Sequence, residues 1–332
     1  MELARENMAL KREAGRGMPG GLIGASPVFT DAVATARRAA NSDATVLILG
    51  ETGTGKELIA REIHSAGGRS KGPFLALNCG ALPENLLERE LFGHERGAFT
   101  GADATTPGLL EAASDGVLLL DEILEMSLGL QVKLLRVLDG HEFLRLGGTR
   151  PIRSRVRFLA ATNQDPVKAV ADRRFREDLF FRLNVLKVSL PPLRERGDDI
   201  LMLADHFLAA FARSTGRNLE GYSPEARRAM QEYPWPGNVR ELKNVVERAV
   251  ILCEGPKVEA GDLRLSGGAP EAGMEAWLGL PFREAKKRFE EAYLKKALKT
   301  SSGNISRAAE STGIDRKNLK EKIREYGFRD PE

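Results

Sequence analysis

Short apolar runs alternate with segments of helical spacing through the first half of the chain. The runs cover residues 46–49, 74–77, 117–120 and 156–161. Apart from Arg157 these runs hold no polar residue, and short runs of this kind are typical of strands that are buried on both faces of a sheet. Helical spacing is found at 22–40, where Val28, Val33 and Ala36 are expected to face inward, and at 58–64, 82–92 and 131–138. The alternation predicts an α/β domain with a parallel sheet over residues 21–190.

The pattern changes at Pro191-Pro192, after which no further apolar runs of this kind occur. Residues 200–212, 224–232 and 239–252 have helical spacing, which predicts a helical subdomain over residues 191–264. A stretch rich in Gly, Ala and Pro at 265–275 is typical of a linker. The polar residues 1–20 are interpreted as a tail or as the remnant of a linker.

The last part of the chain, residues 276–332, predicts a small all-α domain. A long amphipathic helix at 282–299 precedes a short helix at 304–311, which Gly303-Asn304 would cap, and a basic helix at 315–326. The two shorter helices are separated by Thr312-Gly313-Ile314. This is the layout of a helix-turn-helix, whose second helix enters the major groove of DNA.

The charge of the chain is uneven. The net charge is +3 over 332 residues, yet residues 277–332 hold fourteen Lys and Arg against nine Asp and Glu. A basic module on a slightly acidic body favours nucleic-acid binding at the C-terminal end. Cys79 and Cys253 have no metal-ligand spacing, and no apolar run reaches ~18 residues, so a reduced cytoplasmic location without membrane contact is expected.

A glycine-rich turn follows the first apolar run and opens the helix predicted at 58–64. Its backbone N–H groups, the helix N-terminus and a lysine form the kind of cradle that holds nucleotide phosphates. The expected nucleotide-binding residues are Gly50, Glu51, Thr52, Gly53, Thr54, Gly55, Lys56 and Glu57. Glu57 stands where the general pattern has a Ser or Thr hydroxyl for Mg²⁺. The turn predicts binding of a nucleoside triphosphate.

The apolar run at 117–120 ends in Asp121 and Glu122. Near a phosphate cradle, one carboxylate at a strand end can hold Mg²⁺ and a second can polarise the attacking water. Asn163 follows the next strand and could orient that water. Arg176 and Arg182 lie beside an apolar cluster. They either form surface ion pairs or reach the nucleotide of a neighbouring subunit, and their spacing does not decide between these alternatives.

A further segment has neither helical nor alternating spacing and is predicted to be a loop. It consists of Gly97, Ala98, Phe99, Thr100, Gly101 and Ala102. A phenylalanine at the tip of a loop is costly to leave in water unless something receives it. On composition alone, the loop is either a buried turn whose Phe packs on the body or a contact site for a partner.

Taken together, these motifs resemble those of the bacterial enhancer-binding proteins, the AAA+ activators of RNA polymerase carrying sigma-54. The resemblance covers nearly everything after Gly21. Residues 50–57 are similar to the family's Walker A motif, and Glu57 matches the family. Asp121 and Glu122 resemble its Walker B acids, and Asn78 corresponds to the residue thought to switch Glu122.

The resemblance extends to the remaining motifs. Thr162-Asn163 is similar to sensor I, and Arg176 and Arg182 lie in the segment that matches the arginine fingers. Arg240, within the sensor II-like segment 235–242, is implied to contact the nucleotide. Residues 97–102 match the loop that binds sigma-54. Two positions depart from the family pattern: Leu124 replaces a common glycine, and Glu321 replaces a frequent basic residue of the recognition helix.

The resemblance implies a ring of six or seven subunits that uses ATP and Mg²⁺ to remodel the closed complex of sigma-54 RNA polymerase into the open complex. The Fis-type helix-turn-helix is implied to bind upstream enhancer DNA. The expected DNA-binding residues are Arg316, Lys317, Asn318, Lys320 and Lys322.

Alternatives to this interpretation remain open at the level of the sequence. The chain could be a nucleotide-gated DNA-binding regulator that does not hydrolyse ATP, or a general AAA+ remodeller. The C-terminal module could be a helical hairpin for protein contact. Many family members begin with a receiver or sensor domain, so this chain is expected to be either a naturally short activator or a fragment.

Overall fold

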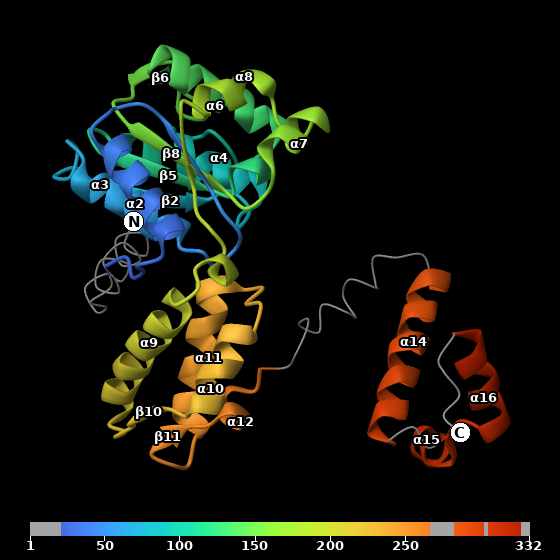
Figure 1. The fold of residues 1–332 in the computed structure, drawn as a ribbon. Helices are drawn as coiled ribbons and strands as arrows, with labels where there is room; N and C mark the ends of the chain where they lie inside the picture. The colour runs from blue at the N-terminus through green and yellow to red at the C-terminus, as the bar shows by residue number, and fades with distance from the viewer. Residues whose placement is uncertain (1–20, 266–281, 302–304, 327–332) are drawn as a thin grey trace. The chain divides into compact units, whose positions relative to one another are not determined.

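The computed structural model describes residues 21–265, 282–301 and 305–326, which belong to two compact units, residues 1–265 and 266–332 (Figure 1). The segment 1–20, the expected linker after Leu265 and the Gly303-Asn304 cap lie outside the described residues.

The first unit is built on a five-stranded parallel sheet in the order β2-β5-β8-β1-β9. The strands are β1 (Val46–Leu49), β2 (Phe74–Asn78), β5 (Val117–Asp121), β8 (Arg157–Thr162) and β9 (Leu186–Ser189). The expected α/β fold with a parallel sheet is therefore confirmed. β9 was not predicted, because the apolar pattern did not single out residues 186–189.

Helices cover both faces of this sheet (Figure 1). They are α2 (Pro27–Ala40), α3 (Lys56–Ala66), α4 (Glu84–Phe92), α6 (Leu128–Gly140) and α8 (Glu177–Leu183). Alternate residues of β5 enter different clusters: Val117 and Leu119 join residues of α2 and α3, whereas Leu118 and Leu120 join those of α4, α6 and α8. A strand buried on both faces needs apolar residues throughout, which is why β5 has no polar interruption.

Helix α2 corrects one expectation. Its buried residues include Phe29, Ala32 and Ala36, while Val28 is 48% exposed. The prediction that Val28 faces inward is therefore wrong. The buried stripe starts at Phe29, and a shift of one residue turns a side chain about 100° around the helix.

Short elements complete this part of the unit. They are α5 (Leu109–Ala112), the 3₁₀ turn η1 (Ile123–Glu125), α7 (Pro166–Ala171), and the antiparallel pairs β3 (Gly93–His94) with β4 (Thr106–Pro107) and β6 (Glu142–Phe143) with β7 (Ile152–Arg153). Strands of two residues carry too little periodicity to be recognised in a sequence.

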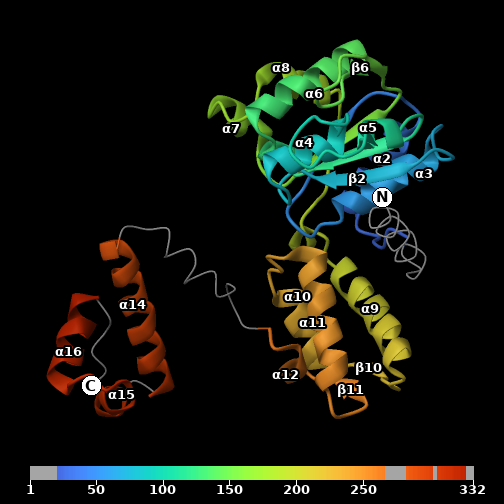
Figure 2. The ribbon, with the colours of Figure 1, turned by 180° about the vertical axis from the view of Figure 1, so that it is seen from behind.

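A helical lid follows β9 (Figure 2). Its elements are η2 (Leu193–Glu195), α9 (Asp199–Thr215), β10 (Gly221–Tyr222), α10 (Pro224–Glu232), α11 (Asn238–Leu252), β11 (Lys257–Val258) and α12 (Ala260–Leu263). Trp235 is fully buried in the lid core, and its indole N–H donates to the Met230 carbonyl at 2.8 Å. A buried indole needs such an acceptor, so this bond fixes the segment that leads into α11.

The second unit contains α14 (Phe282–Thr300), α15 (Ile305–Thr312) and α16 (Arg316–Glu325). Leu294, Ala308, Ala309, Leu319 and Ile323 form its small core. Across the described ranges of both units, no helix is long and apolar enough to cross a membrane.

Candidate functional site

The glycine-rich turn, residues 50–55, joins β1 to α3 at the carboxyl edge of the sheet. Gly53 and Gly55 have φ angles of +80° and +100°, which strain any other residue. A Cβ on Gly53 would also collide with the carbonyl oxygen of Gly237. Thr54, which is buried, donates its hydroxyl to the Glu51 carbonyl at 2.8 Å. The turn therefore has the compact shape of a phosphate cradle.

Lys56 starts α3 with a buried side chain. Its Nζ donates to the carbonyl oxygens of Gly50 at 2.9 Å and of Glu51 at 3.2 Å, so the ammonium lies against the turn. Burial lowers the pKa of Lys56, while the charges of Asp121 and Glu122 act in the opposite direction. Lys56 therefore contacts the turn and interacts electrostatically with both acids.

Asn78 and Asp121 are register partners at the ends of β2 and β5. Glu122 follows with a φ of 53°, unusual for a residue with a side chain, and its N–H donates to Asp121 Oδ1 at 3.0 Å. The Oδ1 of Asn78 accepts from the Gly80 N–H at 2.8 Å. A Cβ on Gly80 would lie 2.7 Å from Glu122 Oε2, so Asn78 and Glu122 border the same glycine.

Asn163 follows β8, which lies between β5 and β1 in the sheet. Its Nδ2 donates to the Thr52 hydroxyl at 2.9 Å. The strand order therefore places Asn163 against the glycine-rich turn and next to the strand that ends in the acids.

The lid contacts the glycine-rich turn directly, through residues that the sequence did not assign to the site. Arg194 donates to both carboxylate oxygens of Glu51, at 2.9 and 2.6 Å. Asn238 donates to Glu51 at 3.1 Å and to the Thr52 carbonyl at 3.0 Å, and accepts from the Leu193 N–H at 2.7 Å. The hydrogen bonds from Arg194 lower the pKa of Glu51. Asn238 lies in the sensor II-like segment 235–242 but had not been assigned to the site, and Arg194 had no signal apart from its place after Pro191-Pro192.

Arg240 lies in the first turn of α11. A Cβ on Gly53 of the glycine-rich turn would lie 3.1 Å from the Arg240 Cβ, and the Arg240 charge contributes to the lowered pKa of Lys56. The expected sensor II arginine therefore lies beside the same turn as Lys56.

The two expected finger arginines are engaged within their own subunit. Arg176 pairs with Asp178 through two hydrogen bonds of 3.0 and 2.6 Å, and Arg182 contacts Asp139 at 3.0 Å. Thr45, which precedes β1, donates its hydroxyl to the Arg182 carbonyl at 2.7 Å. Arg182 therefore lies at the amino edge of the sheet, a strand length of roughly 13 Å from the turn at the carboxyl edge. The structure does not bring Arg182 to the glycine-rich turn of its own chain.

The loop of residues 97–102 lies between β3 and β4. It is closed by the Gly97 N–H, which donates to the Ala102 carbonyl at 2.8 Å, and by the Ala102 N–H, which donates to the Phe99 carbonyl at 3.0 Å. Thr100 is exposed. The half-buried ring of Phe99 packs on the body: the Arg89 guanidinium is 4.1 Å from the ring centre and the His94 ring 4.9 Å. The loop thus combines a docked Phe with an exposed Thr.

Charged side chains brace the base of this loop. Glu95 accepts from the Thr105 hydroxyl at 2.7 Å and from Arg145 at 2.9 Å, and these bonds lower the pKa of Glu95. Arg145 also donates to both carboxylate oxygens of Glu111, at 2.8 and 2.6 Å. The loop is therefore tied to neighbouring segments at its base and left open at its tip.

In the second unit, Asp315 caps α16 by accepting from the Lys317 N–H at 2.9 Å. Most of the expected DNA-binding residues are exposed on this helix: Arg316, Lys317, Asn318 and Lys320. Lys322 is different, because it is half-buried and its Nζ contacts Glu290 of α14 at 2.8 Å. Unlike the other four residues, Lys322 is therefore engaged in a contact within its own domain.

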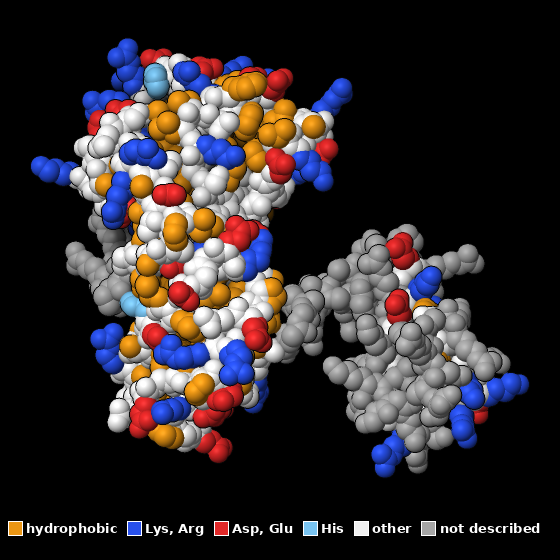
Figure 3. Space-filling model, in the orientation of Figure 1, with side chains coloured by type: hydrophobic (Ala, Val, Ile, Leu, Met, Phe, Trp, Pro, Cys, Tyr) orange, Lys and Arg blue, Asp and Glu red, His pale blue; other side chains and the backbone are white. Residues whose placement is uncertain are grey.

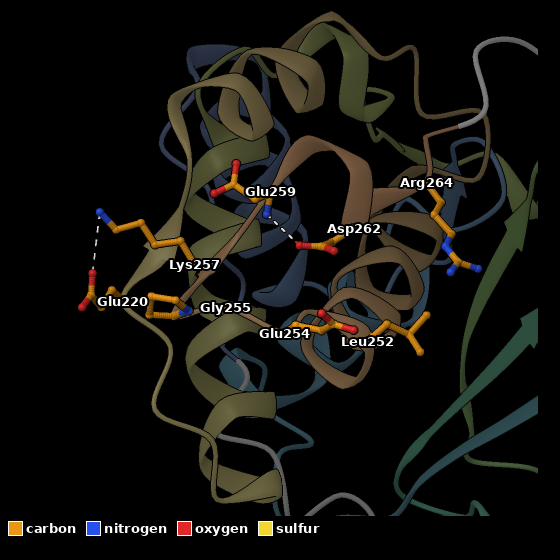
Figure 4. Close-up of a pocket in the computed structure, with 9 residues that line it drawn as sticks. Glu220, Leu252, Glu254, Gly255, Lys257, Glu259, Asp262 and Arg264 are labelled. Carbon is orange, nitrogen blue, oxygen red and sulfur yellow. Dashed lines mark hydrogen bonds and ion pairs between the residues drawn. The ribbon is translucent and has the colours of Figure 1, made fainter.

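The lid also contains a hollow of about 570 Å³ near β10, β11 and α12 (Figure 4). Its charged walls are partly paired with one another: Lys257 contacts Glu220 at 3.6 Å, and Asp262 accepts from the Glu259 N–H at 2.9 Å. None of the residues that line it belongs to the cradle described above.

Comparison with known proteins assigns three parts of the chain to families. Residues 22–189 match the Sigma-54 interaction domain, residues 194–272 the AAA+ ATPase lid domain, and residues 287–326 the Fis family of bacterial regulatory proteins.

Relatives and a solved structure extend over most of the chain. Regulatory protein AtoC of Escherichia coli (strain K12) is 47% identical over 314 residues, which cover 93% of this chain and 68% of AtoC. Nitrogen fixation protein AnfA of Azotobacter vinelandii is 43% identical over 329 residues, 99% of this chain and 62% of AnfA. The crystal structure of NtrX from Brucella abortus in complex with ATP has a TM-score of 0.72 at 37% identity, covering 98% of this chain and 74% of that one. This chain spans only part of each of these proteins.

These matches confirm the expected fold class, the AAA+ ATPase domain and the Fis-type DNA-binding domain. The residues that match the Sigma-54 interaction domain precede those that match the lid domain. The chain belongs to the family of sigma-54-dependent transcriptional activators.

Proposed function

We propose that this protein works as a ring in which ATP hydrolysis moves the loop of residues 97–102 against sigma-54 and remodels the closed promoter complex into the open one. The observation that carries the proposal is the convergence of Lys56, Asp121, Glu122 and Asn163 on one glycine-rich cradle, while Thr100 is exposed on a separate loop.

The residues around the cradle suit the hydrolysis of ATP. Lys56 binds phosphate oxygens in place of the carbonyls that it contacts now, and Glu122 accepts a proton from the attacking water, which Asn163 orients. Asp121 fits Mg²⁺, because magnesium in such sites is held by one or two carboxylates together with substrate phosphates. The metal would supply neutralisation of phosphate charge. Asn78, beside Glu122, holds that carboxylate until the nucleotide is in place.

Two observations support a site that is shared between subunits. Arg182 lies at the amino edge of the sheet, so a nucleotide at the carboxyl edge of the same chain is beyond its reach. Hydrophobic side chains also gather over α7 and α8, as Figure 3 shows, with Val167 64% and Phe181 65% exposed. Apolar side chains this exposed next to charged residues favour a protein interface. A second copy of the chain would cover them and receive Arg176 or Arg182 at its nucleotide.

The second unit is proposed to bind upstream enhancer DNA through α16. Arg316, Lys317, Asn318 and Lys320 reach phosphates and bases, while Lys322 acts inside the domain through Glu290. Binding at an upstream site raises the effective concentration of the ring at the promoter. Six or seven subunits, and a cytoplasmic location, stay predictions.

Replacement of Thr100 with alanine tests the role of the loop. Thr100 is not part of the cradle, so the Thr100→Ala variant should assemble and hydrolyse ATP at a near-normal rate. It should not bind sigma-54 in the presence of ADP and aluminium fluoride, and should give no open complex with purified sigma-54 polymerase. A variant that still forms open complex normally would rule out the proposed role. One that loses ATPase activity would make the loop part of the fold or of the subunit contact.

A further inference from the structure

Gln131, near the start of α6, connects two parts of the nucleotide site that the proposed function places in different interfaces. Its side chain is completely buried. The Nε2 donates to the carbonyl oxygens of Met126 at 2.7 Å and Arg174 at 3.1 Å, and the Oε1 accepts from the Arg176 N–H at 2.9 Å. One buried amide therefore holds the backbone at Arg174 and Arg176, where the segment with the two expected finger arginines, residues 176–182, begins.

The Met126 end of this link leads directly to the hydrolytic acid. Met126 follows η1, and Glu122 is the residue that precedes this turn. The turn is closed by the Glu125 N–H, which donates to the Glu122 carbonyl at 2.9 Å, and by the Met126 N–H, which donates to the Ile123 carbonyl at 3.2 Å. A short turn closed in this way transmits a movement of Glu122 to Met126 instead of absorbing it.

A second connection runs parallel to the first. Gln164, next to Asn163, donates from Nε2 to the Glu125 carboxylate at 2.5 Å. Its Oε1 accepts from the Arg174 guanidinium at 3.2 Å. The strand end that contacts the glycine-rich turn and the turn after Glu122 thus both lead to the residues before Arg176.

Helix α6 also holds the other arginine of the finger segment. Arg182 donates to the Leu138 carbonyl at 3.2 Å and contacts the Asp139 carboxylate at 3.0 Å, both in the last turn of α6. The whole finger helix α8 is therefore anchored on α6, with Gln131 at one end and Asp139 at the other.

We propose that Gln131 is a positioning residue that ties the backbone of Arg176 to the turn after Glu122 in the same subunit. With Arg176 as the finger, the state of one ATP site then sets the position of the arginine that this subunit offers to its neighbour. This inference rests on the proposed function, because it requires a nucleotide site shared between subunits. The coupling around the ring then has one direction, because a change at the acids of one subunit alters the nucleotide site of the neighbour that its finger contacts.

Mixing of inactive variants tests this link. Methionine matches glutamine in length and lack of branching but lacks its polar atoms, so Gln131→Met keeps the volume and removes all three hydrogen bonds. Its ATP turnover should fall by up to about 10²-fold, the cost of displacing a reacting group by ~1 Å. Because its own acids remain intact, mixing it with Glu122→Gln, which has an intact finger, should raise turnover by about tenfold or more over either variant alone. Mixing it with Arg176→Ala, which also lacks a working finger, should not raise it.

Other patterns overturn the inference. Rescue by Arg176→Ala and not by Glu122→Gln would place the defect of Gln131→Met at its own acids. Wild-type turnover, or rescue by both partners, would show that the link does not set the finger. A mixture of Glu122→Gln with Arg176→Ala is the separate test of the shared site. If that mixture stays inactive, the proposed function fails independently of Gln131.

Controls separate positioning from loss of stability. Tyr222→Phe removes another buried hydrogen bond, which the Tyr222 hydroxyl donates to the Ala204 carbonyl in the lid. This variant should turn over ATP at the wild-type rate, both alone and when mixed with Glu122→Gln or Arg176→Ala in the same way as the wild type. If Gln131→Met does not assemble, Gln164→Met interrupts the second connection at a partly exposed position. It should be rescued by Glu122→Gln and not by Arg176→Ala, and the reverse pattern would overturn the inference.

Discussion

Replacing Arg89 with methionine should release the loop of residues 97–102 from the body of the protein. In the structure the Arg89 guanidinium lies 4.1 Å from the centre of the Phe99 ring, and both side chains are half-buried. The Arg89 Nε is buried and has no hydrogen-bond partner among the described residues, so the ring is a main contact of this guanidinium. Methionine keeps an apolar stem under the ring and removes the cation.

The magnitude follows from the type of contact. A cation over an aromatic ring contributes about 0.5–1 kcal/mol when exposed and ~2 kcal/mol when desolvated, so we take about 1 kcal/mol for this half-buried pair. A change of that size alters the ratio of released to docked loop about fivefold. If sigma-54 binds only the released loop, its apparent Kd without nucleotide falls by the same factor. With ADP and aluminium fluoride, where the loop is released in both proteins, the affinities should be nearly equal.

The assay is a titration of labelled sigma-54, followed by fluorescence anisotropy, with and without the transition-state analogue. Arg61→Met is the matched control, because the Arg61 guanidinium lies 4.6 Å from the Phe74 ring centre, away from the loop. Its binding of sigma-54 should equal that of the wild type. An Arg89→Met protein that hydrolyses ATP normally but binds sigma-54 no better than the wild type without nucleotide would refute the docking role of Arg89.

Two further predictions concern stability and DNA binding. The buried Asp199 carboxyl loses solvation, but hydrogen bonds from the Ala25 N–H and the Arg196 guanidinium outweigh this, so the pKa of Asp199 is lowered. Asp199→Ala should cost about 3 kcal/mol at neutral pH. Because the folded pKa is lower than the unfolded one, the part of this difference that comes from ionisation is complete above about pH 3.9 and is lost as the pH falls through the folded pKa. Urea unfolding of both proteins between about pH 2 and 7 checks it, and a difference that stays constant over this range contradicts it. For DNA, Arg316→Ala should weaken binding to a sequence selected from a random pool more than binding to unselected DNA. Lys320→Ala should weaken both alike and reduce the salt slope by about 0.9. Anisotropy titrations over a range of salt would contradict this if both variants lost affinity equally on both DNAs.

The sequence by itself determined the local features of this protein. The apolar runs predicted four of the five strands of the sheet. In β1 and β5 the run follows from burial on both faces, whereas β8 also contains the buried Arg157 and the edge strand β2 is only partly buried. The turn at 50–56 could be recognised because its chemistry is local: the glycines, the lysine and the following helix are adjacent in the chain. β9 was missed although residues 186–189 contain Leu186 and Val188, because an edge strand interrupted by Lys187 gives no continuous apolar run.

Tertiary structure decided how these features meet. Asn78 and Asp121 end two strands and Asn163 follows a third, and only the order β2-β5-β8-β1 brings them to one edge beside the glycine-rich turn. The bond from Arg194 to Glu51 joins residues 143 positions apart, and the bond from the Arg176 N–H to Gln131 joins residues 45 apart. Contacts of this kind produce no periodic pattern in the sequence, because each side chain looks like an ordinary polar residue of a turn or helix when only its neighbours in the chain are considered. They form only when the packing of the sheet, its helices and the lid brings distant backbone segments within hydrogen-bond distance.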